Sequence, residues 1–383
     1  MRANSSKFKQ TRSWMLGGAS PVRLPSAMGA VRKVGTARSW NNRQYSKRQR
    51  EPGLEVTPAE PAERSGRRPG ERAVSCPART ESPMPRAAID IGSNSLLLLV
   101  VGDDGAVVHD EARVVGLGRG LGDRGVFRPD RMEAALAVLG EYSAIARNLG
   151  VEPADVRAVA TSASRRALNA TTFYASVKAR TGIRVEVVSG EEEARLTWLG
   201  GVDGLGLGPG TSLLCDPGGG STEVILGEGP HIRSRVSLEI GTVRLTEQFL
   251  GTGVVSASAL ARLRAHVEAA VDTLQIDAIP RAAVAVAGTA TTLAAADLGL
   301  SSYDASVVHG SSLTAAALRR WTDRLLAAGP EERRRLVAVS PERADTVLAG
   351  AVILLAVLVK ARRQAWRVSD RGLRFGAIQR TQS

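Results

Sequence analysis

Hydrophobic and polar positions from residue 86 onward form short apolar runs that alternate with longer segments of helical spacing. Short apolar runs bounded by Gly, Pro or Asp are typical of strands, and the longer segments are typical of helices that cover a sheet. In the first half, the expected elements are strands within 86–114, at 155–161 and at 183–188, and helices at 130–149, 167–181 and 190–201. In the second half, they are strands within 211–238 and near 283–287, and helices at 256–274 and 311–327. The pattern predicts an α/β chain.

A Gly-rich stretch at 200–210 separates the two halves and predicts a hinge or linker. We therefore expect two domains, at 85–204 and 205–383. Near the C-terminus, the apolar run Leu348–Val359 spans 12 residues without interruption. A membrane-spanning helix needs about 20 residues, so we expect a buried helix here and no association with a membrane.

The N-terminal segment, residues 1–84, shows no apolar periodicity, so it cannot offset the entropy of ordering. We expect a disordered basic extension. A transit-like peptide, a nucleic-acid-binding tail and a segment without function all remain open, because Arg, Ser and few acids suit each of them. Met84 directly precedes the first expected strand. That position favours translation from Met84, with residues 1–83 as a mis-called upstream extension.

The formal net charge of +13 would by itself suggest a nucleic-acid-binding protein. Residues 1–84 carry a net charge of +11, however, and residues 85–383 only +2. We therefore expect no specific nucleic-acid partner for the body of the chain. Two cysteines and four widely spaced histidines exclude a disulfide framework and a Cys- or His-based metal site. This composition predicts a cytoplasmic protein.

The same loop occurs twice in the body, each time between two apolar runs. The first copy comprises Asp90, Gly92, Ser93, Asn94 and Ser95, and the second comprises Asp216, Gly218, Gly219, Gly220, Ser221 and Thr222. In both copies Gly lies two residues after the Asp, and Ser lies five residues after it. Ordinary turn chemistry does not require this matched spacing. The repeat predicts two similar halves that face each other.

These residue types suit a polyanion. Glycine lets backbone N–H groups approach an anion closely, and hydroxyl groups add neutral donors. The aspartate that ends each strand would repel phosphate, but it can hold Mg2+. A third loop, Val284–Thr292, carries Gly288 and several hydroxyl residues before a helical segment. Phosphate binding at that helix start and simple N-capping by Thr both explain it.

Acidic residues and an arginine between the two loops supply candidate catalytic groups. Ser189-Gly190 is followed by Glu191, Glu192 and Glu193. Glutamate is favoured in the first turn of a helix by the helix dipole, and a carboxylate can also deprotonate the water that hydrolyses a phosphoanhydride. Arg165 follows an expected strand and can stabilise charge on a transferring phosphoryl group, although a charged helix surface also explains it.

Taken together, these stretches resemble the exopolyphosphatase/guanosine pentaphosphate phosphohydrolase family, of the actin and sugar-kinase superfamily. The resemblance extends over nearly all of 86–380, and its motifs are Ile89–Ser95, Ala160–Asn169, Ser189–Ala194, Asp216–Glu223, Ser237–Leu245 and Ala287–Leu293. It implies two ribonuclease-H-like domains of the actin-like ATPase type, with the active cleft between them. Pro217 departs from the family pattern, which has a branched apolar residue there.

The resemblance also implies roles for individual residues. Glu193 matches the catalytic base, with Glu192 as the alternative, and Arg165 matches a motif arginine. Asp90, Asp216 and Glu223 become candidates for binding Mg2+. The phosphate-binding candidates are Gly92, Ser93, Asn94, Ser95, Gly218, Gly219, Gly220, Ser221 and Thr222.

We therefore predict a Mg2+-dependent exopolyphosphatase that releases the terminal phosphate of inorganic polyphosphate. Hydrolysis of guanosine pentaphosphate and a non-catalytic phosphate or nucleotide sensor are the alternatives, and a homodimer is expected.

Two further sequence patterns are not assigned to the predicted site. Gly120–Gly125 fits a dinucleotide-binding pattern but is not bracketed by a strand and a helix, so a loop before a helix at Pro129 is expected. His109-Asp110 is expected at a strand end.

Overall fold

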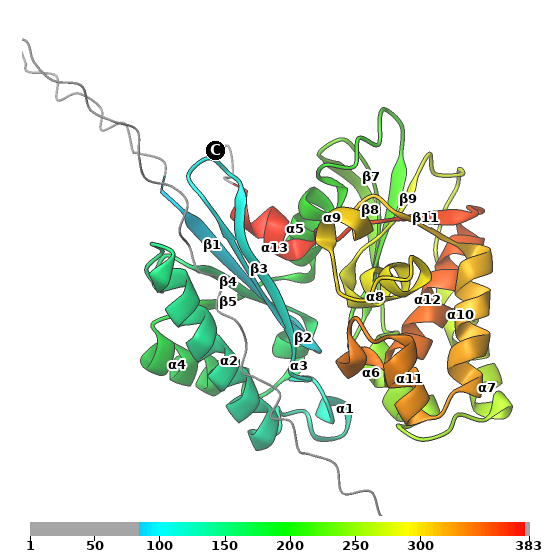
Figure 1. Ribbon diagram of the computed structural model, residues 1–383, viewed down its shortest axis with the longest axis horizontal. Coiled ribbons are helices and arrows are strands. Elements are labelled where there is room, and N and C mark those ends of the chain that lie inside the picture. The colour runs from blue at the N-terminus through cyan, green and yellow to red at the C-terminus, as the bar shows by residue number, and fades with distance from the viewer. Residues whose placement is uncertain (1–83, 380–383) are drawn as a thin grey trace, which may run out of the picture. The chain divides into compact units, whose positions relative to one another are not determined.

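The computed structural model describes residues 84–379, which fold around two mixed sheets (Figure 1). The predicted N-terminal extension comprises residues 1–84, and all of it except Met84 lies outside the described residues. The first sheet has the strand order β3-β2-β1-β4-β5. Its strands are β1 (Arg86–Ile91), β2 (Ser95–Val101), β3 (Val107–Val114), β4 (Arg157–Ala160) and β5 (Val185–Val187). β1, β2 and β3 form an antiparallel meander, and β4 runs parallel to β1.

The second sheet repeats this arrangement. Its strand order is β10-β11-β9-β6-β7-β8, in which β6, β7 and β8 form the meander and β9 runs parallel to β6. Its strands are β6 (Ser212–Pro217), β7 (Thr222–Glu228), β8 (His231–Leu238), β9 (Ala283–Ala285), β10 (Ser312–Thr314) and β11 (Ala365–Val368). Each predicted loop therefore joins the first two strands of its own meander, so the loops occupy equivalent places in the two sheets.

Period-two alternation explains how the first sheet is covered on both faces. Ile89, Ile91 and Leu98 of the central strands pack in one core with helices α2 and α4, whereas Ala88 packs in another core with Leu373. The helices of this half are α1 (Leu121–Arg124), α2 (Pro129–Asn148), α3 (Ser162–Arg166), α4 (Ala170–Thr181) and α5 (Gly190–Val202). Because successive side chains of the central strands point to opposite faces and are apolar on both, helices cover the sheet on each side.

The second sheet supports the largest core of the described residues, and the predicted apolar helix near the C-terminus lies in it. The helices that follow β8 in the chain are α6 (Thr242–Leu245), η1 (Thr246–Leu250), α7 (Ala257–Asp272), α8 (Ala287–Asp297), α9 (Ala305–Val308), α10 (Ala315–Ala327), α11 (Pro330–Leu336), η2 (Pro341–Arg343), α12 (Val347–Lys360) and α13 (Leu373–Ile378). Val347, Ile353 and Leu358 of α12 are fully buried. The prediction of a buried helix here is confirmed, and no helix in residues 84–379 is long and apolar enough to cross a membrane.

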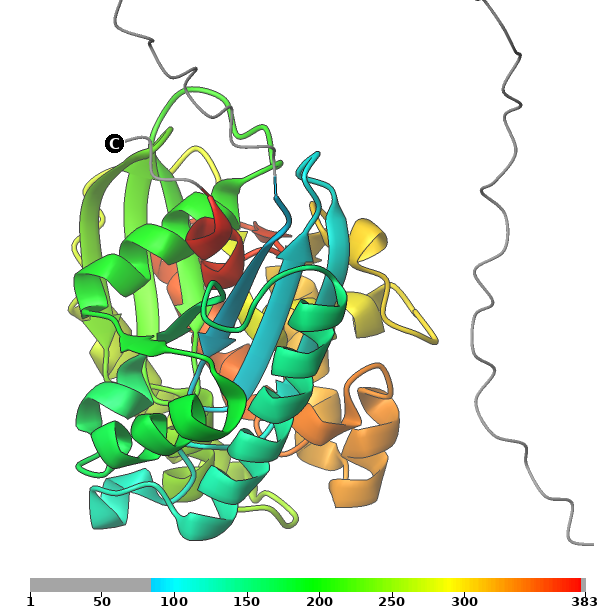
Figure 2. The same ribbon diagram turned by 90° about the vertical axis from the view of Figure 1, so that its left-hand side faces the viewer.

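Helices α5 and α13 pack against each other between the two sheets (Figure 2). α13 contacts β1 and β2, and α5 contacts β6 and β8. Two glycines permit this approach, because a Cβ at Gly376 would overlap the carbonyl oxygen of Leu196, and a Cβ at Gly200 would overlap that of Gly372. Gly200 and Gly201 therefore lie inside a packed helix, and the predicted hinge at 200–210 is reduced to the connection after Val202.

Replacing Gly376 with Ala is expected to lower the free energy of unfolding by about 3 kcal/mol, because the added methyl group has no space against the backbone of α5. Gly140→Ala is the matched control: a Cβ at this position in α2 meets no atom within 4 Å, so the change should be neutral or stabilising. Denaturant unfolding of both variants measures the difference. Equal stability of the two variants would contradict the close packing.

Several sequence expectations differ from the structure in detail. The helix expected at 311–327 begins only at Ala315, because residues 312–314 form the edge strand β10 and Thr314 caps the helix. The helix expected at 167–181 is α4, which begins only at Ala170, and a separate short helix, α3, precedes it at Ser162–Arg166. His109-Asp110 lies in the middle of β3 instead of at its end, because the hairpin partner β2 extends the ladder past it. Residues 120–125 form the short helix α1 between two left-handed glycines.

Candidate active site

The two predicted phosphate loops lie in direct contact. Gly92–Asn94 connects β1 to β2, and 218–221 connects β6 to β7. A Cβ at Gly219 would lie 3.0 Å from the Cβ of Ser93 and 3.3 Å from the backbone nitrogen of Asn94. A Cβ at Gly220 would lie 2.6 Å from Nη2 of Arg166. Glycine is therefore needed here for the approach of the two loops as well as for that of a ligand.

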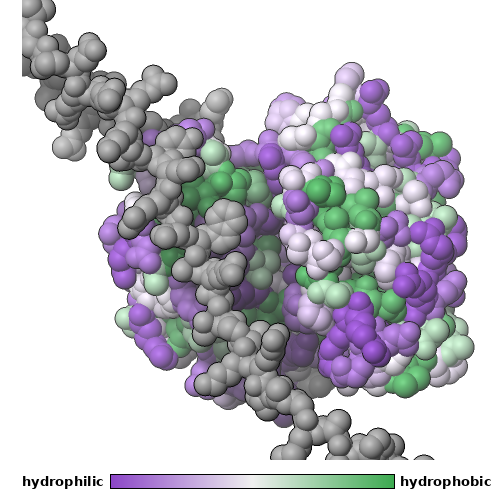
Figure 3. Space-filling model, in the orientation of Figure 1, coloured by the Kyte–Doolittle hydropathy of each residue, from purple (hydrophilic) through white to green (hydrophobic). Residues whose placement is uncertain are grey.

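Both loops line one cavity of about 530 Å³. Figure 3 shows the hollow between the two halves, bordered by hydrophilic residues. Twelve of the fourteen predicted site residues lie on its wall: Asp90, Gly92, Ser93, Asn94, Ser95, Glu193, Asp216, Gly218, Gly219, Gly220, Ser221 and Glu223. The fold thus brings together residues that are up to 133 positions apart in the chain.

Four of the carboxyl groups that line this cavity, those of Asp90, Glu193, Asp216 and Glu223, have raised pKa values. Burial, together with the nearby charge of Glu193, raises the pKa of Asp90 to about 7 and that of Asp216 to about 7. Burial and the same neighbour raise the pKa of Glu223 to about 8, although hydroxyl groups of Ser221 and Ser237 donate to it. Burial also raises the pKa of Glu193. Four ionised groups in this space repel one another, so the site favours a bound cation or a proton.

The donor set fits Mg2+ shared with a phosphate ligand. Among residues 84–379, no group of three or more His, Cys, Asp or Glu side chains is arranged to hold a metal ion by itself. Mg2+ commonly takes only one or two carboxylates and completes its shell with water and phosphate oxygens. In addition, the Oδ1 atom of Asn94 is buried at the cavity without a hydrogen-bond partner among the described residues. Asp90, Asp216 and Asn94 therefore supply oxygen donors of the type that this cation prefers.

Glu193, and not Glu192, reaches the cavity. The hydroxyl group of Ser189 caps α5 by accepting from the backbone N–H of Glu192, so the first-turn explanation of the acidic run holds as well. Glu192 points away and pairs with Arg195 at 2.7 Å and Arg157 at 3.2 Å, and hydrogen bonding to Arg195 lowers its pKa. Glu193 lies one position further around the helix and lines the cavity.

Two predicted site residues do not line the cavity. Nη1 of Arg165 donates to Glu193 at 2.6 Å and to the carbonyl oxygen of Val188 at 3.1 Å, so this arginine supports Glu193 from behind. Thr222 is fully buried, and its hydroxyl group donates to the carbonyl oxygen of Ile240. Arg165 is thus placed to hold the Glu193 carboxylate in position. The Thr222 hydroxyl group is engaged in a hydrogen bond within the fold and does not face the cavity.

Arg343 lines the cavity and was missed by the sequence analysis. Its Nη2 donates to the hydroxyl group of Ser95 at 3.2 Å, and its guanidinium packs over Gly288, where a Cβ would overlap it. Among the described residues, no carboxylate lies within ion-pair distance of it, and burial lowers its pKa. A cation held in this way is suited to an anionic ligand. Its only signal in the sequence is an arginine shortly before the apolar helix α12.

The third predicted loop also reaches the cavity, at the start of α8. The helix begins after Val286 and has no side-chain cap, so Thr capping does not account for its hydroxyl residues. Ala287, Gly288 and Thr289 line the cavity. Ala287 adopts φ 67°, which is strained for a residue with a Cβ. The first N–H groups of α8 are therefore available at the cavity wall.

An ion-pair network around Arg374 forms another part of the cavity wall. Arg374 of α13 donates to both carboxylate oxygens of Asp110 at 2.8 Å and to the carbonyl oxygen of Asp370. Asp370 also accepts from the hydroxyl group of Tyr303. Burial and the charge of Glu193 raise the pKa of Asp90, and the positive charge of Arg374 opposes part of this rise.

Comparison with known proteins identifies related sequences for most of this chain. Residues 100–382 match the Ppx/GppA phosphatase family. Exopolyphosphatase 2 of Mycobacterium tuberculosis is 36% identical over 296 residues, which is 73% of this chain and 91% of that protein. The bifunctional 3-dehydroquinate synthase/phosphatase of Fusobacterium nucleatum is 28% identical over 307 residues, which is 76% of this chain and 46% of that protein.

Solved structures show the same fold. A Ppx/GppA enzyme of Aquifex aeolicus superposes with a TM-score of 0.65 at 36% identity, over 76% of this chain and 98% of that one. An exopolyphosphatase of Cytophaga hutchinsonii superposes with a TM-score of 0.68 at 27% identity, over 76% and 96%. These matches confirm the predicted α/β fold of the actin-like type and the predicted enzyme class, a phosphoanhydride hydrolase. The chain belongs to the Ppx/GppA phosphatase family.

Proposed function

We propose that this protein is an exopolyphosphatase that hydrolyses the terminal phosphoanhydride bond of inorganic polyphosphate. The observation that supports this most is the contact between two matched phosphate loops above a group of buried carboxylates. Two loops that face one cavity can hold adjacent phosphates of one chain from both sides. The names of the Mycobacterium and Cytophaga relatives agree with this substrate.

The side chains of the cavity suggest how the chemistry is divided. Backbone N–H groups of both loops, the hydroxyl groups of Ser93 and Ser95, and the guanidinium of Arg343 would orient the terminal phosphate. Glu193 would accept a proton from a water molecule as the water oxygen attacks the terminal phosphorus and the bridging P–O bond breaks. Arg165 would hold the Glu193 carboxylate in place.

Asp90 and Asp216, with Asn94 beside them, are the residues that would hold Mg2+. When bound, Mg2+ supplies positive charge that neutralises the phosphate oxygens and the leaving phosphate. Their raised pKa values show that the ionised carboxylates are costly inside the fold. A bound cation would offset the repulsion between these carboxylates. Asp216→Asn would remove part of the same repulsion even when no cation is bound.

Phosphate release from long-chain polyphosphate by the full chain, in the presence of Mg2+, tests the proposal. Steady release of orthophosphate, with the remaining chains shortened from their ends, is expected. Competition between guanosine pentaphosphate and long-chain polyphosphate then measures which of the two predicted substrates the enzyme prefers. Binding of polyphosphate without any release would favour the predicted sensor instead. A homodimer and a cytoplasmic location stay predictions.

Adding Mg2+ is expected to raise the melting temperature of the wild-type protein by a few degrees. A ligand that binds only the folded state at 100 times its Kd stabilises that state by about 2.7 kcal/mol. Asp216→Asn should melt higher than the wild type without Mg2+, because one of the repelling charges is gone, and should gain less on Mg2+ addition. Thermal melting with and without chelator measures both effects. An equal Mg2+ response in the two proteins would contradict Asp216 as a ligand.

A further inference from the structure

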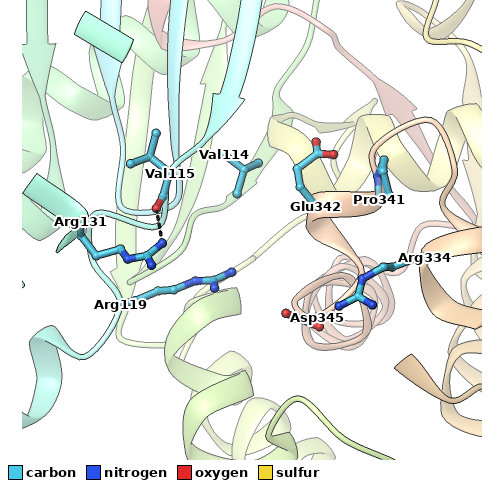
Figure 4. Close-up of a pocket in the computed structure, with 8 residues that line it drawn as sticks. All are labelled: Val114, Val115, Arg119, Arg131, Arg334, Pro341, Glu342 and Asp345. Atoms are coloured by element: carbon cyan, nitrogen blue, oxygen red, sulfur yellow. Dashed lines mark hydrogen bonds between the residues drawn. The ribbon is translucent and has the colours of Figure 1, made fainter. Parts of the chain in front are cut away.

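A second pocket, of about 250 Å³, lies beside the main cavity. Three of its eight lining residues are arginines. Figure 4 shows Arg119 and Arg131 on one side of the pocket and Arg334 on the opposite side, with Arg131 donating to the carbonyl oxygen of Val115 at 3.2 Å. Glu342 and Asp345 also line it. Three guanidinium groups against two carboxylates leave the pocket with a net positive charge.

The arginines differ in how firmly they are paired. Arg131 contacts Asp130 at 3.0 Å, and Arg334 contacts Glu331, both on the surface. Surface ion pairs of this kind contribute little and exchange readily. Arg119 has no carboxylate within ion-pair distance among the described residues, and it is half-buried. Arg119 is therefore the cation most available to an anionic ligand in this pocket.

The backbone connects this pocket directly to the first phosphate loop. The N–H groups of Val115 and Gly116 donate to the carbonyl oxygen of Asn94 at 2.9 and 2.8 Å, and that of Gly118 donates to Ser93 at 2.7 Å. Arg119 follows immediately in the chain. On the opposite wall, Glu342 lines both cavities, and the next residue is Arg343. The two cavities are thus neighbours that share one wall residue.

We propose that the arginine-lined pocket binds the phosphate units of a polyphosphate chain that follow those in the main cavity. This inference rests on the proposed function, because it assigns a second subsite to the same substrate. A polyphosphate carries negative charge on every unit, so a chain that extends from the main cavity into this pocket meets the guanidinium groups of Arg119 and Arg334. Arg119 and Arg334 then set the preference for long chains over short ones.

The test compares long-chain polyphosphate with tripolyphosphate, which has only three phosphate units to share between the two cavities. Arg119→Gln and Arg334→Gln should each raise KM for the long chain by about 10-fold, with kcat unchanged and with KM for tripolyphosphate within about twofold of the wild type. Glu342→Gln should lower KM for the long chain, because it removes a repelling charge. The matched control is Arg335→Gln. Arg335 lies beside Arg334 in α11 but does not line the pocket, so this variant removes the same charge from outside it.

The outcomes separate the two proposals. If the wild type releases phosphate but the Arg119 and Arg334 variants change KM equally for both substrates, or not at all, the second subsite is wrong and the proposed function stands. An equal effect of Arg335→Gln would also overturn the subsite, because general surface charge would then explain the result. If the wild type releases no phosphate from either substrate, the proposed function fails, and the subsite fails with it.

Discussion

Glu193→Gln is expected to lower kcat for polyphosphate hydrolysis by about 100-fold or more, with KM little changed. The amide keeps the size of the side chain and can still accept from Arg165, but it cannot take a proton from water. Its position supports this role, because Glu193 is buried on the cavity wall next to both phosphate loops. Steady-state kinetics of phosphate release provide the measurement.

Glu192 offers a matched control for this experiment. It is adjacent in the same helix turn, has the same chemistry, and pairs with Arg157 and Arg195 away from the cavity. Glu192→Gln should keep kcat close to that of the wild type. Similar losses in both variants would indicate a general effect on α5, and unchanged turnover in Glu193→Gln would rule out Glu193 as the base.

Arg343→Gln is expected to reduce kcat/KM by about 100- to 1,000-fold, the range seen when a donor that stabilises developing charge is removed. The guanidinium contacts Ser95 of the first loop, and no carboxylate among residues 84–379 pairs with it, so its charge is available to the substrate. Kinetics with polyphosphate measure the loss. A loss below tenfold would place Arg343 outside the binding of the reacting phosphate.

Arg165 provides the contrast to Arg343. Because its guanidinium donates to Glu193 and to a backbone carbonyl, we expect it to act through Glu193. Arg165→Gln should lower kcat by about 10-fold, and the double variant with Glu193→Gln should lose no more than Glu193→Gln alone. A fully additive loss in the double variant would instead support direct contact between Arg165 and the phosphate.

Much of the site was predictable because its signals are local. The spacing of Asp, Gly and Ser in each loop reflects the chemistry of one turn between two strands, and β1–β2 and β6–β7 form at the expected places. The start of α5 was predictable for the same reason, since a Ser cap and first-turn Glu act over only a few residues. The resemblance to a known family added the superfamily fold, which these local patterns do not reveal.

Other features depend on contacts between distant segments. Glu192 and Glu193 are equivalent in the sequence, and only the packing of α5 against the second sheet and α13 decides which one faces the cavity. The sequence predicts that the Thr222 hydroxyl group donates to a phosphate, yet in the structure it donates to the carbonyl oxygen of Ile240. Arg343 lies 248 residues from the Ser95 that it contacts, so no local pattern could assign it to the site.

The sequence by itself determined most of the strands, the two matched Asp-Gly-Ser loops and the capped start of α5, because turn, cap and period-two signals act between near neighbours. Only the tertiary structure decided that Gly219 and Ser93 touch, that the four carboxyl groups repel one another, and that Arg343 and the second pocket adjoin them. The reason is physical: burial and through-space charge depend on which distant segments pack together, and the chain order does not encode those distances.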